Sequence, residues 1–317
     1  MLKVIELFAG IGSQTQALKN IGVPHEVVAI SEIDKYALKS YELLHGSVKN
    51  LGDISLVKVE DVPDCDLLTY SAPCQDISVA GEQQGLDEGS NTRSSLLWEC
   101  KRIIEAKRPK YLLMENVKNL VGKTHIHNFE KWLKLLETYG YKNYWKVLNA
   151  TNYDVPQNRE RVFVVSILGE ESFSFPEPIP RTKFLEDILD SEEDVPANMY
   201  MNDRPFIFRD NIVESENGLI HVGNLEMAGN DAVKRVYSPQ GVCPTLTTMG
   251  GGHRQPKIWD EVFGVRKLTA RECWKVMGFT DEQFAKVRSL SDTQLYKQAG
   301  NSICVPCLEA IFKKLFL

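Results

Sequence analysis

The chain has 317 residues, of which 43% are hydrophobic and 25% charged, and its net charge at pH 7 is −6. This length suits one large domain with a smaller one appended, and the composition is ordinary for a globular protein. The sequence contains no apolar run long enough for a membrane span, and the negative charge disfavours a non-specific coat on nucleic acid.

Apolar runs and helical periods alternate along the first 168 residues. Strands are expected at 2–8, 25–34, 65–72, 110–117, 144–155 and 161–167. Helices are expected at 10–22, 34–46, 96–109 and 127–141, where apolar residues recur with a helical period. Buried strands that alternate with helices are typical of an α/β protein with a doubly wound sheet. The first residues enter a strand pattern without the layout of a signal peptide, so we expect a cytoplasmic protein.

The pattern changes after residue 169. Pro176, Pro178 and Pro180 indicate a linker, and the stretch that follows has acidic, basic and glycine-rich pieces without strong helical periodicity. Helical patterning returns at 269–279. We therefore expect a first domain formed by 1–169 and 266–317, and a smaller, mostly β or irregular domain at 170–265.

A glycine-containing turn, "ELFAGIGS", follows the first expected strand. Phe8, Gly10 and Gly12 lie there between a strand and a helix, where backbone N–H groups can approach a ligand. Glu32 ends the next strand, where a carboxylate can accept hydrogen bonds from ribose hydroxyls, and Asp53 is expected to end a third strand and meet an adenine amino group. The pattern indicates an adenosine-containing ligand, with a simple tight turn as the alternative. The absence of a third glycine disfavours a nicotinamide dinucleotide.

One of the seven cysteines is placed unusually. In "SAPCQD", Cys74 follows Pro73 where an apolar strand opens into a glycine-dotted loop, and ligands bind at such strand ends in α/β sheets. Thiolate is the reactive form of cysteine, so a presented nucleophile is one interpretation and a buried structural thiol is the other. Cys304 and Cys307 lack a second metal-binding pair, so we expect core packing there and no metal.

Further polar residues stand at other strand ends. Glu115 ends the apolar run "YLLMENV", where a carboxylate is either locally capped or held for proton transfer. Arg159 and Arg161 in "QNRER" are expected to begin a strand and, being two apart, to point the same way. Each alone would be an ordinary surface residue, but together with Cys74 they could surround a polar substrate.

These motifs together resemble those of the DNA (cytosine-5)-methyltransferase family of bacteria and phages. "ELFAGIGS" is similar to the family's cofactor motif and "SAPCQDIS" to its catalytic Pro-Cys loop. "MENV" and "QNRER" are similar to two further motifs, and "RKLTARECWKVMGF" and "QAGNSICVP" to the last two. The resemblance covers nearly the whole chain in family order, which is far more specific than any single motif.

The resemblance implies a sequence-specific DNA cytosine-5 methyltransferase that uses S-adenosylmethionine. Cys74 would add to C6 of a flipped cytosine, and Glu115 would hold or protonate N3. Arg159 and Arg161 would stabilise the addition state, and the methyl group would pass to C5. The family's cofactor-binding positions fall on Phe8, Gly10, Gly12, Glu32, Asp53, Leu96, Asn301 and Ser302.

The resemblance also makes 170–265 the target-recognition domain and double-stranded DNA the partner. Candidate DNA contacts are Arg93, Lys234, Arg235, Thr245, Leu246, Arg254 and Lys257. For each charged residue among them, a solvated surface charge is an equal alternative. We expect a monomer without a membrane partner. A restriction enzyme that acts on the same site without being bound is compatible with this interpretation.

Two other functions stay open beside this one. A branch of the family methylates cytosine in tRNA on the same fold, although the Thr-Leu segment at 245–246 favours DNA. A non-catalytic binding module is disfavoured by the intact Cys74 and Glu115. Ile33 stands where the family often has an aromatic residue to cover adenine, so the packing of the adenine ring is open.

Overall fold

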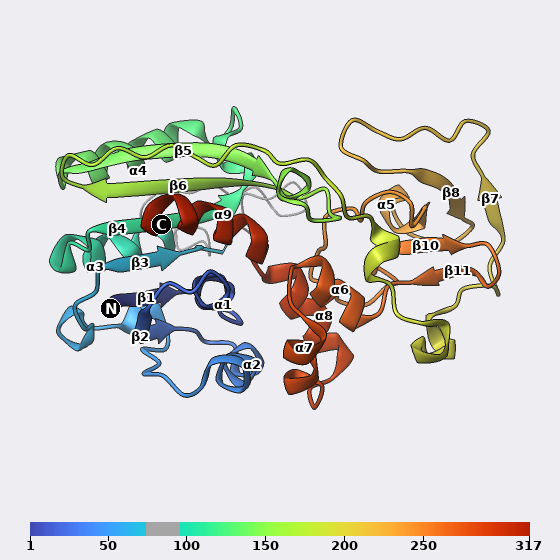
Figure 1. Cartoon of the computed structure of the whole chain (residues 1–317), viewed down its shortest axis with the longest axis horizontal. Helices are drawn as coiled ribbons and strands as arrows, with labels where there is room; N and C mark the ends of the chain where they lie inside the picture. The colour runs from blue at the N-terminus through green and yellow to red at the C-terminus, as the bar shows by residue number, and fades with distance from the viewer. Residues whose placement is uncertain (74–95) are drawn as a thin grey trace. The chain divides into compact units, whose positions relative to one another are not determined.

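Figure 1 shows the computed structural model of the chain, which describes residues 1–73 and 96–317. The chain forms two compact units. Unit 1 comprises residues 1–148, 160–177 and 308–317, and unit 2 comprises 149–159 and 178–307. These units do not coincide with the predicted functional domains, because 266–307 belongs to unit 2. The assignment of 170–265 to target recognition stays a prediction.

Unit 1 contains a six-stranded sheet in the order β2-β1-β3-β4-β6-β5. Its strands are β1 (Leu2–Leu7), β2 (His25–Ser31), β3 (Leu67–Tyr70), β4 (Tyr111–Val117), β5 (Tyr141–Asn149) and β6 (Glu160–Leu168). β1 pairs in parallel with β2 and β3, and β3 in parallel with β4, whereas β6 runs antiparallel to β4. The strand order confirms the predicted α/β sheet, because parallel neighbours are joined by helical crossovers.

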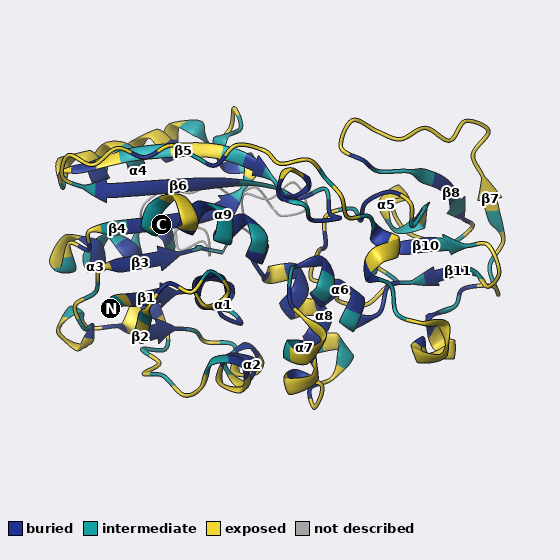
Figure 2. Cartoon of the chain, viewed as in Figure 1, coloured by how far each residue is buried: buried dark blue, intermediate teal, exposed yellow. Residues whose placement is uncertain are grey.

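Helices cover this sheet because alternate strand residues form an apolar face. The helices are α1 (Ser13–Asn20), α2 (Lys35–His45), α3 (Glu99–Lys107), α4 (Ile126–Thr138) and α9 (Val305–Phe316), of which α9 begins in unit 2. Leu112 and Met114 of β4 share one core with Ile104 of α3 and Trp132 of α4, and Figure 2 shows these strands as buried. Glu6 and Glu115 have the opposite parity in their strands, so they lie on the other face of the sheet.

Unit 2 contains a five-stranded sheet in the order β11-β10-β9-β8-β7 and a group of short helices. The strands are β7 (Phe206–Phe208), β8 (His221–Leu225), β9 (Arg235–Tyr237), β10 (Lys257–Asp260) and β11 (Gly264–Lys267). The helices are α5 (Asp231–Lys234), α6 (Ala270–Val276), α7 (Asp281–Val287) and α8 (Asp292–Asn301). Thr269 and Glu272 cap the start of α6 reciprocally, and Glu272 also accepts two hydrogen bonds from buried Arg266.

Short 3-10 turns fill the connections, and two of them correct strand predictions. They are η1 (Ile54–Leu56), η2 (Val59–Asp61), η4 (Lys118–Val121), η5 (Ala150–Tyr153), η6 (Leu185–Ile188), η7 (Glu192–Asp194) and η8 (Ala197–Met199). Asp53 caps η1 and does not end a strand. The strand expected at 144–155 stops at Asn149, whose side chain caps η5. Polar residues that bond their own backbone favour such turns over strands.

Within the described ranges, no helix is both long and apolar enough to cross a membrane.

Candidate active site

The glycine-containing turn of unit 1 is held by the carboxylate of Glu32. Its Oε2 accepts a hydrogen bond from the Gly10 backbone N–H at 2.8 Å, and its Oε1 accepts from the N–H groups of Ile33 and Asp34 at 2.8 and 2.7 Å. Phe8, Gly10 and Gly12 all have positive φ, at 57°, 57° and 78°. Glycine adopts this conformation without strain, which explains two of the three residues. The structure therefore joins the glycine-containing turn to Glu32, two features that the sequence predicts for an adenosine-containing ligand.

Asn50 is part of this arrangement and was missed by sequence reasoning. Its Oδ1 accepts from the N–H groups of Glu32 and Gly52 at 3.1 and 3.0 Å, and its Nδ2 donates to the Glu32 carbonyl at 3.0 Å. Asn50 thereby links the strand end at Glu32 to the turn before Asp53. A single asparagine in the stretch "SVKNLGD" gives no signal that separates this role from an ordinary turn residue.

The remaining cofactor candidates lie in different parts of the chain. Gly12 has no room for a side chain, because an added Cβ would come within 2.6 Å of the His45 ring. Leu96 packs against the core of unit 1. Asn301 and Ser302 belong to unit 2, where they end helix α8 and follow it.

Glu6 is a fully buried carboxyl below the same turn. Its Oε1 accepts from the backbone N–H and the hydroxyl of Thr15, both at 2.8 Å. Burial raises the pKa of Glu6 to about 7, although the hydrogen bonds from Thr15 oppose this. The carboxyl group that holds the first turn of α1 therefore gains or loses a proton near neutral pH.

We predict that this carboxyl makes stability depend on pH. Because its pKa is higher in the folded chain, the folded state keeps a proton that the unfolded state loses above pH 4.5, so stability falls as pH rises towards 7 and beyond. The loss should reach about 3 kcal/mol. Urea unfolding of the parent and of Glu6→Gln at pH 5 and pH 8 measures it. The parent should lose more stability than the variant, and exposed Glu26→Gln serves as the control. Equal pH dependence in parent and Glu6→Gln would refute the prediction.

Glu115 and Arg161 meet on one face of the unit 1 sheet. Glu115 lies opposite Phe163, and Arg161 lies opposite Val117, so the two side chains are diagonal neighbours across β4 and β6. Arg161 Nε lies 3.2 Å from Glu115 Oε1, and both side chains are largely buried, with 16% and 10% of their surface exposed. A guanidinium at this distance holds the carboxyl group in a fixed orientation.

The residue after Glu115 connects this pair to the chain segment that precedes the predicted nucleophile. Asn116 is buried, and its Nδ2 donates to the carbonyl of Ala72 at 3.1 Å. Ala72 precedes Pro73, the last residue described before the gap, whereas the predicted nucleophile Cys74 and the predicted DNA contact Arg93 lie outside the described residues. The "MENV" motif therefore contributes both the carboxylate and a tether for the chain that leads to Cys74.

Arg159 takes a different position from the one expected. Strand β6 begins at Glu160, so the prediction that Arg159 and Arg161 share a strand and point the same way is wrong. Arg159 is buried in unit 2, where it donates to the carbonyls of Leu246, Gly300 and Ser302 at 2.9–3.0 Å. Three carbonyl partners in two separate segments make it a structural tie for the Thr-Leu segment.

The Thr-Leu segment is held from two sides within unit 2. Thr245 Oγ1 donates to the Asn158 carbonyl at 2.6 Å, and Leu246 N–H donates to Gln157 Oε1 at 3.2 Å. Gly300 of α8 lies against the backbone of Thr247, where an added Cβ would come within 1.9 Å of the carbonyl oxygen. Sequence reasoning did not single out Gly300, because the close approach joins segments far apart in the chain.

The basic candidates of unit 2 differ in how they are placed. Arg254 is exposed, and Lys234 ends the short helix α5. Arg235 forms an ion pair with Asp231, which balances the charge of its guanidinium. Lys257 is buried, with its amine on the carbonyls of His253 and Gln255 at 2.6 and 3.2 Å, an arrangement that the sequence pattern did not predict.

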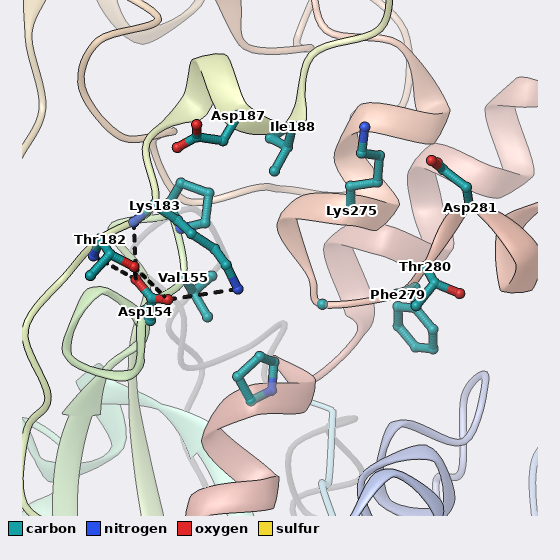
Figure 3. Close-up of a pocket in the computed structure, with 13 residues that line it drawn as sticks. Asp154, Val155, Thr182, Lys183, Asp187, Ile188, Lys275, Phe279, Thr280 and Asp281 are labelled. Atoms are coloured by element: carbon teal, nitrogen blue, oxygen red, sulfur yellow. Dashed lines mark hydrogen bonds and ion pairs between the residues drawn. The ribbon is translucent and has the colours of Figure 1, made fainter.

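A pocket of about 570 Å³ in unit 2 has none of the predicted site residues in its lining (Figure 3). Lys183 and Asp154 face each other in it with Nζ and Oδ2 3.7 Å apart. Although burial opposes the shift, hydrogen bonds from Thr182 and Lys183 lower the pKa of Asp154. The Asp154 charge is thus already paired. In the described part of the chain, no group of three or more His, Cys, Asp or Glu residues could hold a metal.

Comparison with known proteins shows the family to which the chain belongs. The family model for C-5 cytosine-specific DNA methylases matches residues 2–317. The type II methyltransferase M2.ScrFI of Lactococcus lactis subsp. cremoris is 40% identical, over 100% of this chain and 99% of that protein. The orphan methyltransferase M.SPBetaI of Bacillus phage SPbeta is 32% identical, over 99% and 97%. M.HhaI of Haemophilus parahaemolyticus, a type II methyltransferase, is 34% identical, over 98% and 93%.

Solved structures share the fold. The Dnmt2 methyltransferase of S. pombe superposes with a TM-score of 0.77 at 20% identity, over 100% of both chains. A prophage-encoded DNA modification methyltransferase of E. coli, described as putative in its name, superposes with a TM-score of 0.71 at 20% identity, over 100% of this chain and 99% of that one. At this identity the likeness establishes the methyltransferase fold alone.

Proposed function

The chain belongs to the family of C-5 cytosine-specific DNA methylases, and from this premise we propose that it methylates C5 of cytosine at a specific sequence in double-stranded DNA. The observation that carries the proposal is the Glu115–Arg161 pair beside Asn116, which tethers the chain just before Pro73 and Cys74. Strand β3, which leads to Ala72, and strand β4, which carries Glu115, are neighbours in one sheet, and this supports a carboxylate and a cysteine that act on the same base.

Each residue of this group has a defined chemical task in the proposal. The Cys74 thiolate forms a bond to C6 of an extrahelical cytosine, which makes C5 an enamine-like nucleophile. Glu115 holds the ring at N3 and gives it a proton, which offsets the negative charge that builds there, while Arg161 keeps the carboxyl group oriented. After C5 has gained the methyl group, a base removes the C5 proton and the C6–sulfur bond breaks, which frees the thiolate. Arg159 acts indirectly, by holding the Thr-Leu segment.

Residues of unit 1 suit the methyl donor. S-adenosylmethionine supplies the electrophilic methyl group in this family. Glu32 would accept a hydrogen bond from a ribose hydroxyl at Oε2, which accepts from Gly10 alone and has a further lone pair, whereas Oε1 already accepts from two N–H groups. An added Cβ at Gly10 would meet nothing within 4 Å, which leaves space beside the turn for a ligand. Ile33 exposes 75% of its surface next to Glu32, where an apolar side chain could cover the adenine ring.

A comparison of duplex DNA and tRNA as acceptors of the methyl group tests the proposal. Purified protein is incubated with labelled S-adenosylmethionine and either duplex plasmid DNA or mixed tRNA. We expect label in duplex DNA and none in tRNA. Label in tRNA alone would favour the tRNA methyltransferase of the same fold, and no label in either, despite cofactor binding, would favour a binding module.

The glycines at 250–252 allow a direct test of close DNA approach. Gly250 is exposed, its φ is not positive and an added Cβ would meet nothing within 4 Å, so Gly250→Ala should fold with unchanged stability. If the backbone lies against DNA, the methyl group overpacks the contact, which costs about 1–3 kcal/mol and weakens DNA binding about tenfold or more. Titration of labelled duplex measures the effect. An unchanged dissociation constant would show that this backbone does not approach DNA.

A further inference from the structure

The loop between Met249 and Lys257 has an exposed tip on two buried ends. Gly250, Gly251, Gly252 and Arg254 are exposed, whereas Met249 and Lys257 are each only 2% exposed. The buried ends fix where the tip emerges. An exposed, glycine-rich tip on a rigid base is the form in which loops present recognition groups.

The backbone of this loop is strained at two residues that are not glycine. Met249 and His253 have φ of 50° and 57°, in the left-handed region. Such a conformation is unfavourable for a bulky residue and persists only where its surroundings enforce it. The conformation of Met249 is held by burial, with its sulfur 4.0 Å from Cys273 Sγ, and by its N–H, which donates to Thr247 Oγ1.

Lys257 holds His253 in its left-handed conformation. The Lys257 amine donates to the carbonyl of His253 at 2.6 Å and to that of Gln255 at 3.2 Å. Both carbonyls belong to the return arm of the loop, so a single side chain from β10 closes that arm. Arg204 also touches the arm, with its guanidinium 3.4 Å from His253 Nε2.

The Lys257 amine is buried close to other positive charges, which is unfavourable for its own charge. Lys257 lies opposite Lys267 across β10 and β11, and Arg204 is a third nearby cation. Among the residues that the structure describes, none of these three forms an ion pair, and Asp203 is the nearby carboxylate. Burial, Lys267 and Arg204 lower the pKa of Lys257 to about 8. An apolar residue would avoid this penalty, so stability does not explain the lysine.

We propose that Lys257 is a positioning residue, which holds the 249–255 loop in the single conformation that reads the DNA sequence. The inference rests on the proposed function for its DNA-reading part, but the ordering of the loop can be measured without DNA. It replaces the earlier expectation that Lys257 itself contacts DNA, because its amine is occupied by the loop carbonyls.

The chain offers a matched control for the test. Lys257→Met removes the two hydrogen bonds to the loop, whereas Lys267→Met removes the opposing charge from the same strand pair without touching a loop carbonyl. Amide hydrogen exchange of residues 249–255 in the free protein is measured first. We expect about tenfold faster exchange or more in Lys257→Met, parental exchange in Lys267→Met, and a thermal midpoint at least as high as the parent's in both.

The second measurement is discrimination by the full-length enzyme. The ratio of kcat/KM for the cognate duplex to that for a duplex with one changed base pair should fall about tenfold in Lys257→Met, since a loop with several conformations no longer rejects the wrong base. Lys267→Met should keep the parental ratio.

Three results would overturn the proposal. Parental exchange in Lys257→Met would show that the amine does not order the loop. Faster exchange with parental discrimination would show that the ordered loop does not read sequence. An equal loss of discrimination in both variants would show a general effect of charge. Should Lys257→Met not fold, Lys257→Gln, whose shorter side chain ends in a neutral amide, undergoes the same two measurements. If even the parent fails to methylate DNA, the proposed function fails while the exchange result still decides the loop's ordering.

Discussion

Replacing Cys74 by serine should abolish methyl transfer while binding of S-adenosylmethionine and of DNA persists. A serine hydroxyl is far weaker as a nucleophile than a thiolate and ionises far less readily, so the bond to cytosine C6 would not form. Single-turnover transfer of labelled methyl groups to duplex DNA measures the first effect, and equilibrium binding of each partner measures the second.

Cys65 provides the matched control for this variant. It is partly exposed, and burial together with Asp66 and Asp64 raises the pKa of its thiol to about 12, so it remains protonated. Cys65→Ser should therefore retain the parental rate. Substantial turnover in Cys74→Ser, or an equal loss in both variants, would contradict the nucleophilic role of Cys74.

Changing Glu115 to glutamine should slow methyl transfer by roughly 10²–10⁴-fold, the range of general acid–base catalysis. Glutamine keeps the shape of the side chain but cannot hold a transferable proton or offset ring charge, and Arg161 loses its partner at 3.2 Å. The single-turnover rate at saturating DNA isolates this effect from binding.

Glu160 is the control carboxylate for this experiment. It begins strand β6 next to Arg161, but its partner is the exposed Lys118 at 2.9 Å. Glu160→Gln should therefore leave the rate unchanged, since exposed ion pairs contribute little. A near-parental rate in Glu115→Gln would show that Glu115 is structural.

The sequence was sufficient for those parts of the molecule that depend on local pattern. Apolar runs placed β1, β2, β3 and β4. Glu32 follows β2 and Glu115 lies near the end of β4, as the sequence predicts. The pairing of Glu115 with Arg161 was also within reach, because both lie near the same end of the sheet.

Long-range contacts set the limit of sequence reasoning. Arg159 and Arg161 look equivalent in "QNRER", yet Arg159 bonds carbonyls at 246, 300 and 302, and strand β6 begins between the two arginines. Neither residue spacing nor charge distinguishes a buried tie from a substrate contact. Lys257 shows the same limit, since only tertiary packing turns its amine towards the loop and not towards solvent.

The central claim is tested most directly by mapping methylation at single-base resolution in plasmid DNA after incubation with the protein and S-adenosylmethionine. We predict methyl groups on C5 of cytosine, confined to one short sequence that recurs around the plasmid and absent when Cys74→Ser replaces the parent. Unmethylated DNA from a protein that binds S-adenosylmethionine and duplex DNA, or methyl groups at a position other than cytosine C5, would contradict it.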